Sequence, residues 1–134
     1  MPRPSRRRAP LTHPEPADID LLDVLHALSD PTRMTIVRIL RAEQERACGT
    51  FPVEVAASTL SHHFKVLREA GLIHQREEAN RRLTALRGAD LEARFPGLLD
   101  AILAAAATIP DLGVQSDLRP DPAAAAVAAV LADS

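Results

Sequence analysis

The sequence predicts a mainly α-helical domain with a small β-hairpin. Its 134 residues are enough for one ordinary domain with a tail at each end. Hydrophobic residues make up 46% of the chain, so a core can form, and three phenylalanines stand without any tyrosine or tryptophan. Stretches with helical periodicity come before two short β-type runs, and this order of elements indicates the fold class.

Proline content marks both ends of the predicted domain. Residues 1–17 contain five prolines and four arginines, which predicts a disordered, extended tail. A proline also stops the last helix, so the domain is expected to span residues 18–109. Residues 110–134 then form a linker and an alanine-rich segment, which either packs as a short final helix or is poorly ordered.

Two helices are predicted at the start of the domain. Residues 18–28 place apolar side chains on one broad face, and either Asp18 or Asp20 caps this helix. Asp30 then caps a second helix, which starts at a proline and ends near Arg41.

A linker separates these helices from a third one. Residues 43–54 are interrupted by a glycine and a proline, which predicts a linker with at most a short helix. Residues 57–70 form a strong helix, and Gly71 ends it in the left-handed conformation. Its inward apolar stripe has helical spacing and consists of Leu60, Phe64, Leu67 and Ala70.

A hairpin and a last helix complete the pattern. Residues 73–77 and 82–86 have the composition of two short strands, and Asn80 in the turn between them tolerates a positive φ. Residues 90–103 are predicted to be helical, with an interruption at residues 95–97. A compact helical unit followed by a hairpin is typical of a winged helix-turn-helix, which is the predicted fold.

Charge is distributed unevenly along the chain. The formal net charge is −2, yet residues 1–10 carry +4 and residues 58–88 carry +3. The remaining two segments, 11–57 and 89–134, carry −4 and −5. A local basic segment is the electrostatic feature that phosphate binding requires. The alternative is an ordinary solvated surface.

Two separated segments resemble motifs of one family of bacterial transcriptional regulators. The ArsR/SmtB family's L-x-D-P-T-R-x-x-I-L helix resembles Leu28-Ser-Asp-Pro-Thr-Arg-Met-Thr-Ile-Val-Arg-Ile-Leu40. Its recognition helix, S-x-x-S-x-H-L-x-x-L-x-x-A-G-L-V, resembles Ser58-Thr-Leu-Ser-His-His-Phe-Lys-Val-Leu-Arg-Glu-Ala-Gly-Leu-Ile73. The likeness extends over residues 19–108. It implies a homodimeric winged helix-turn-helix protein that binds operator DNA, with its first and last helices in the dimer interface.

The residue chemistry of the predicted third helix agrees with DNA binding. Opposite its apolar stripe it carries short hydroxyls, an imidazole and an ammonium group, namely Ser58, Thr59, Ser61, His62 and Lys65. Such groups donate to phosphates or reach base edges in a major groove. The hairpin tip adds Asn80, Arg81 and Arg82. The acidic residues beside the tip weaken its potential, so we expect these arginines to position DNA more than to read its sequence.

A homodimer is also predicted from the amount of apolar surface. The outer helices carry more of it than one small core can hide: Leu21, Leu22, Val24, Leu25, Leu98, Leu99, Ile102 and Leu103. Two copies would set their recognition helices about 34 Å apart, one turn of DNA, on a near-palindromic site. The alternative is a monomer in which the alanine-rich C-terminus covers this face.

The usual metal sites of the ArsR/SmtB family are missing or broken. Cys48 has no second cysteine near it, and residues 90–110 contain no histidine. A site of nitrogen and oxygen ligands stays open, and nickel or zinc would suit it. The candidate ligands are His13, Glu15, Asp18 and His26. A resemblance to a nickel-linked regulator of this family points the same way, whereas the alternative for each histidine is a solvated surface group.

The single cysteine limits what else the chain does. Cys48 is a candidate redox switch through a sulfenic acid or an intersubunit disulfide, with inert packing as the alternative.

Glycine-rich phosphate loops, nucleophile elbows and His-Glu zinc motifs are absent from the sequence, so no enzyme activity is predicted. The chain has neither an apolar run of membrane-spanning length nor a signal peptide, and we expect a cytoplasmic protein.

The sequence therefore predicts a sequence-specific DNA-binding transcriptional regulator. It is expected to act as a homodimer and to repress transcription, with a DNA affinity tuned by an effector. The competing interpretation is a winged-helix interaction module that dimerises with a partner regulator without binding DNA itself.

Overall fold

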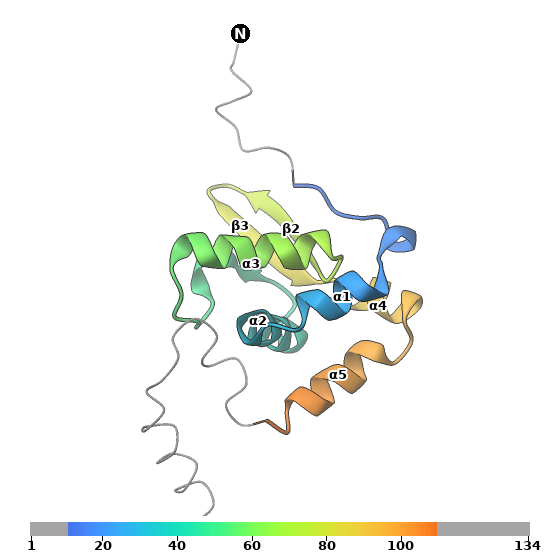
Figure 1. The fold of residues 1–134 in the computed structure, drawn as a ribbon. Coiled ribbons are helices and arrows are strands. Elements are labelled where there is room, and N and C mark those ends of the chain that lie inside the picture. Colours follow the sequence, from blue (N-terminus) through green and yellow to red (C-terminus); the bar gives the residue numbers. More distant parts are fainter. Residues whose placement is uncertain (1–10, 110–134) are drawn as a thin grey trace, which may run out of the picture.

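The computed structural model describes residues 11–109, and the helices and strands lie in the predicted order. The helical elements are η2 (Pro16–Asp18), α1 (Leu21–Ala27), α2 (Pro31–Ala42), η3 (Cys48–Thr50), α3 (Ala57–Glu69), α4 (Gly88–Arg94) and α5 (Leu98–Ala106). The strands are β1 (Arg46–Ala47), β2 (Ile73–Glu78) and β3 (Arg81–Leu86). In Figure 1, α3 crosses the middle of the molecule, with the sheet above and behind it. The predicted winged helix-turn-helix is confirmed.

Aspartate side chains begin the first two α-helices. The Asp20 carboxylate accepts a hydrogen bond from the Asp23 amide at 3.1 Å, and the Asp30 carboxylate accepts one from the Arg33 amide at 3.0 Å. Each satisfies an amide that the first turn leaves free. Of the two caps considered from the sequence, Asp20 is therefore the right one, because Asp18 lies in the separate helix η2.

The sheet has one strand more than predicted. Its order is β1-β3-β2, all antiparallel, and the two residues of β1 pair with Thr84 and Leu83. The prediction of a linker with at most a short helix for residues 43–54 was thus incomplete. Two residues are too few to show strand periodicity in the sequence. They form a strand only because they pair with the edge of β3 that β2 leaves open. The hairpin turn also differs in detail, since Ala79 rather than Asn80 has the positive φ, at 54°.

The core lies between α3, α2 and the sheet. It is aliphatic with two phenylalanines, and its fully buried large side chains include Ile19, Ile36, Leu40, Leu67, Leu72 and Ile73. Gly71 follows α3 with φ +89°, which confirms the predicted left-handed end of that helix.

The ends of the domain differ partly from the prediction. Residues 11–17 were assigned to a disordered tail, but they include the start of η2 and contact the sheet, so the packed region begins before residue 18. The predicted interruption of the last helix is confirmed, because Gly97 has φ +79° between α4 and α5. The predictions for residues 1–10 and 110–134 lie outside the described residues. Within the described residues, no helix is long and apolar enough to cross a membrane.

Candidate nucleic-acid interface

The outer face of α3 carries the polar side chains predicted to meet DNA. Ser58, Ser61, His62 and Lys65 are exposed, and Thr59 is half-buried. The opposite face of the same helix is anchored in the core, chiefly by Phe64 and Leu67. This division leaves the polar face of α3 uncovered. The hydroxyl side chains on this face are short, so they would allow the helix to lie close to the floor of a DNA groove.

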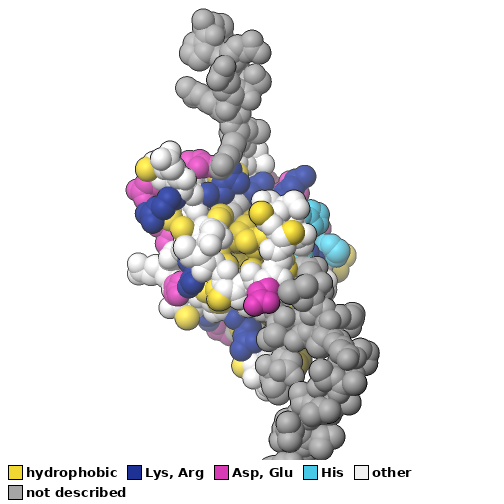
Figure 2. Space-filling view, turned by 90° about the vertical axis from the view of Figure 1, so that its left-hand side faces the viewer, with side chains coloured by type: hydrophobic (Ala, Val, Ile, Leu, Met, Phe, Trp, Pro, Cys, Tyr) yellow, Lys and Arg dark blue, Asp and Glu magenta, His cyan; other side chains and the backbone are white. Residues whose placement is uncertain are grey.

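The hairpin tip lies next to this face of α3. Asn80 and Arg81 are exposed and Arg82 is half-buried. A hollow of about 500 Å³ separates the two elements, lined by Ser61 and Phe64 from α3 and by Asn80 and Arg82 from the hairpin. Figure 2 looks onto this end of the molecule, where hydrophobic side chains lie in the middle with both basic and acidic side chains around them. The structure thus brings Ser61 of α3 and Asn80 and Arg82 of the hairpin onto one surface.

The arginines of the hairpin are paired with acidic side chains. Arg82 contacts Glu77 at 2.8 Å, and Arg81 lies 4.0 Å from Glu78. Both pairs agree with the expectation that acidic neighbours weaken the potential of the tip. On α3 the situation differs, because Lys65 has no ion-pair partner within residues 11–109. Its ammonium is therefore available to a phosphate.

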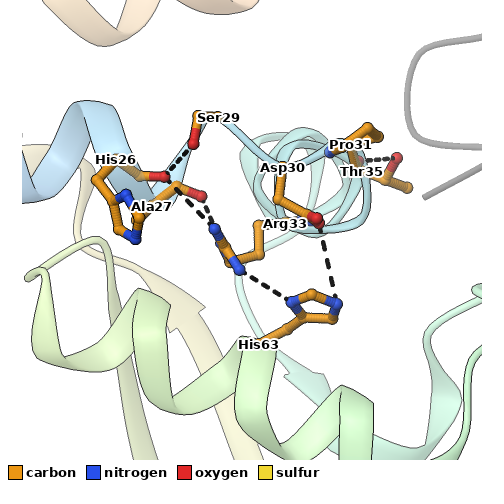
Figure 3. Close-up of polar contacts among 8 residues, drawn as sticks. All are labelled: His26, Ala27, Ser29, Asp30, Pro31, Arg33, Thr35 and His63. Carbon is orange, nitrogen blue, oxygen red and sulfur yellow. Dashed lines mark hydrogen bonds and ion pairs between the residues drawn. The ribbon is translucent and has the colours of Figure 1, made fainter. Parts of the chain in front are cut away.

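A buried arginine fixes α3 against the first two helices (Figure 3). Arg33 is only 8% exposed, and its Nε donates to the Ala27 carbonyl at 2.7 Å while Nη2 donates to the His26 carbonyl at 3.4 Å. Its Nη1 lies 3.1 Å from Nδ1 of His63, which projects from α3. Because a guanidinium only donates, Nδ1 is the acceptor and the imidazole proton is on Nε2, which faces Asp30 at 3.9 Å. The sequence did not predict this contact, although Arg33 is a charged residue among the apolar positions of α2.

A buried glutamine ties α3 to the sheet in a second place. Gln75 is 1% exposed, and its Oε1 accepts a hydrogen bond from Arg68 of α3 at 2.6 Å. Its Nε2 donates to Thr84 on β3 at 3.1 Å and to the Cys48 sulfur at 3.2 Å. Burial, followed by the charge of Arg82, lowers the pKa of Arg68 from its ordinary value. These bonds hold α3 and the hairpin in one fixed relation. The redox role of Cys48 stays a prediction.

Comparison with known proteins agrees with this geometry. An uncharacterised helix-turn-helix transcriptional regulator of Bacillus subtilis, YceK, is 34% identical over 82 residues, which are 59% of this chain and 82% of that protein. The chain belongs to the helix-turn-helix transcriptional regulators. A family model described as a helix-turn-helix domain matches residues 28–76, which include α2, α3 and most of β2.

Solved structures of transcriptional regulators share this fold. A crystal structure of an ArsR family transcriptional regulator matches with a TM-score of 0.52 and 22% identity, over 68% of this chain and 96% of that one. The transcriptional repressor BigR from Xylella fastidiosa matches with a TM-score of 0.51 and 28% identity, over 63% and 84% of the two chains. An ArsR family regulator thus shares this fold, which agrees with the resemblance to the ArsR/SmtB family inferred from two motifs.

The candidate metal ligands of this regulator lie on separate elements. His13 contacts β2, where its Nε2 accepts the Gln75 amide at 3.0 Å and its ring stacks on His74 at 4.3 Å. Burial, followed by the charges of His74, Arg68 and Arg87, lowers the pKa of His13 to about 4. The other candidates are exposed: Glu15 before η2, Asp18 within η2, and His26 on α1. Residues 11–109 contain no cluster of three such ligands. Nickel or zinc binding stays a prediction, and Nε2 of His13 would have to leave the Gln75 amide to join it.

Proposed function

We propose that this regulator binds a near-palindromic operator as a homodimer and represses transcription. One observation carries the proposal: the polar face of α3 and the tip of the hairpin share one surface, and their anchoring side chains are buried. Short hydroxyls on α3 allow close approach to base edges, while Lys65 and the arginines of the tip supply phosphate contacts.

The anchoring contacts favour rigid presentation of this surface. Arg33 connects α3 to α1 and α2, and Gln75 connects α3 to the hairpin. A recognition helix that needs no rearrangement loses less conformational entropy on binding, so more of the contact free energy appears as affinity. Repression follows if the bound dimer blocks polymerase, and BigR, a similar structure, is named as a repressor.

Tuning by an effector is part of the same proposal. Nickel and zinc are the metals to test first, with His13, Glu15, Asp18 and His26 as candidate ligands. A tenfold metal-dependent change in DNA affinity would correspond to a coupling free energy of about 1.4 kcal/mol. If chelator, nickel and zinc give the same affinity, the metal part of the proposal is wrong.

The α3 face predicts two different defects in DNA binding. We expect Lys65→Ala to weaken binding to the upstream intergenic DNA and to a random duplex alike, and to lower the salt slope by about 1, because it removes one phosphate contact. We expect Ser61→Ala to reduce mainly the preference for the upstream DNA, because it removes a group that reaches bases. Fluorescence anisotropy on both duplexes at several salt concentrations measures both effects.

A matched control is Arg94→Ala, which removes an exposed charge from α4 and should leave both affinities unchanged. Equal loss of affinity in the control and in Lys65→Ala would contradict the assignment of α3. If the unmodified protein shows no preference for any upstream fragment and instead captures a second regulator, the interaction-module interpretation replaces this proposal.

The proposed dimer uses the apolar side chains that one chain leaves exposed. Leu22 is 70% exposed and Leu21 and Leu25 are each 40% exposed on α1, whereas Val24 of the same helix is buried within the chain. We expect Leu22→Asp to convert the dimer into a folded monomer, because it places a charge in the apolar interface while removing little from the core. Sedimentation velocity measures the change. A wild-type monomer, or a dimeric variant, would show that this face is not the interface.

A further inference from the structure

Residues 13–19, which we call the edge segment, run along the free edge of β2. Strand β2 is at one edge of the order β1-β3-β2, and the backbone amide of Gln75 donates to Nε2 of His13 at 3.0 Å. Six residues later, Ile19 packs where a side chain on Gly71 would stand. The edge segment therefore runs antiparallel to β2. In Figure 1 it is drawn in blue and leads from the side of the sheet to α1.

Further contacts hold the edge segment in this place. The His13 ring stacks on the His74 ring, with 4.3 Å between the ring centroids. Nη1 of Arg87 donates to the Pro14 carbonyl at 2.8 Å, and the Arg87 side chain is only 9% exposed. Ile19 is 1% exposed. The edge segment is thus fixed at its start, near its middle and at its end.

The His13 contact lies at the base of the hairpin tip. In the register of the sheet, Gln75 faces Thr84, and Thr84 faces Arg46 of β1. His13 therefore lies level with β1, on the opposite edge of the hairpin. Residues 77–82 extend past this level, and within the described sheet they pair only with each other. The hairpin is clamped on both edges just before its tip begins.

Gln75 joins three parts of the molecule at this point. Its backbone amide contacts the edge segment through His13, and its side chain accepts a hydrogen bond from Arg68 of α3. The edge segment leads directly into Asp20, whose side chain caps α1. Helix α1 carries the exposed leucines that we assign to the dimer interface. A short, packed connection therefore runs from the proposed dimer interface to the hairpin.

We propose that His13 is a positioning residue for DNA binding, which acts through Gln75 to fix the hairpin relative to α1. This inference rests on the proposed operator binding. In a dimer, two hairpins must meet one duplex at a set spacing. A hairpin that moves relative to α1 must be ordered on binding, and this ordering lowers the affinity. His13 itself supplies no charge to the DNA.

The contact requires an unprotonated Nε2, because a backbone amide only donates. Burial, followed by the charges of His74, Arg68 and Arg87, lowers the pKa of His13 from 6.5 to about 4. The attached edge segment thus favours the neutral imidazole, so its attachment is strongest above pH 6.5 and weakens as the pH falls toward 4. Linkage gives a weakening of up to roughly tenfold between pH 7.5 and pH 5.5, and water screens part of it at this half-exposed ring.

Two variants of His13 and a neighbouring control test its role in DNA binding. His13→Phe keeps a ring to stack on His74 but removes the acceptor, and we expect it to weaken binding to the upstream DNA by about three- to tenfold. The salt slope should stay unchanged, because no phosphate contact is lost. His13→Gln offers an uncharged oxygen acceptor and should stay within about twofold of the wild type. Thr12→Phe adds the same ring at an exposed neighbouring position and should change nothing.

Amide hydrogen exchange of Gln75, followed by nuclear magnetic resonance without DNA, tests the anchor separately. In the wild type, its protection should fall by about three- to tenfold from pH 7.5 to pH 5.5, after correction for the intrinsic exchange rate. His13→Gln should show no such fall, because its acceptor does not titrate. This comparison still tests the anchor if His13→Phe fails to fold.

Each result bears on one claim. Equal protection of Gln75 in the wild type and in His13→Phe, or an equal pH profile in the wild type and in His13→Gln, would overturn the anchor. Lost protection with unchanged affinity for the upstream DNA would overturn the positioning role. A wild-type protein without any preference for upstream DNA would instead overturn the operator proposal, while the exchange data would still report on the anchor.

Discussion

Replacing Arg33 with Ala is expected to lower the free energy of unfolding by about 3 to 5 kcal/mol, because it leaves buried acceptors unpaired and a cavity behind. The guanidinium donates to two carbonyls at the end of α1 and to Nδ1 of His63. Ala27 and His63 are both buried, so water replaces these bonds poorly. The loss is a large fraction of the stability of an ordinary domain, which is about 5 to 15 kcal/mol.

Urea unfolding followed by far-ultraviolet circular dichroism measures this effect. Arg38→Ala is the matched control on the same helix, where no hydrogen bond or ion pair of the side chain occurs within the described residues, and it should change stability by about 0.5 kcal/mol or less. His63→Ala should cost less than Arg33→Ala, because the two carbonyls keep their donor. If Arg33→Ala and Arg38→Ala have equal stability, the buried contact does not hold α3 in place.

Replacing Gly71 with Ala is expected to cost about 2 to 4 kcal/mol, of which about 1 to 2 comes from the left-handed backbone and the rest from a collision. Gly71 has φ +89°, and a Cβ atom there would stand 2.6 Å from Cγ1 of Ile19. Ile19 is 1% exposed, so its side chain has little room to move away. The same collision would push residues 13–19 from the edge of β2.

The two causes can be separated by a double-mutant cycle. Ile19→Ala in the Gly71→Ala background should relieve the collision but not the backbone strain. The double variant should therefore lose less unfolding free energy than the sum of the losses of the two single variants. Gly49→Ala is the control, because its Cβ would meet no atom within 4 Å and its φ is not in the left-handed region. Full additivity in the urea midpoints would contradict the contact between Ile19 and Gly71.

Most of the fold follows from signals that are local in the sequence. The cap at Asp30, the apolar stripe of α3 and the glycine after it each involve residues within about one to three helical turns, so their periodicity or chemistry predicts the element directly. Strand β1 has no such signal, since its two residues become a strand only by pairing with β3. The turn shows the same limit, because pairing of Glu78 with Arg81 places Ala79 in the left-handed region that the composition favours for Asn80.

The candidate site divides in the same way. The polar residues of α3 and the hairpin tip were predictable, since a helix and a hairpin each display one face by a regular period, and their chemistry matches phosphates and bases. The anchors were not predictable, because Arg33 meets His63 across 30 residues and His13 meets Gln75 across 62. The sequence by itself determined which elements form and which side chains they expose. Only the tertiary structure decided which buried polar groups pair, because such pairing depends on distances between elements that no local pattern encodes.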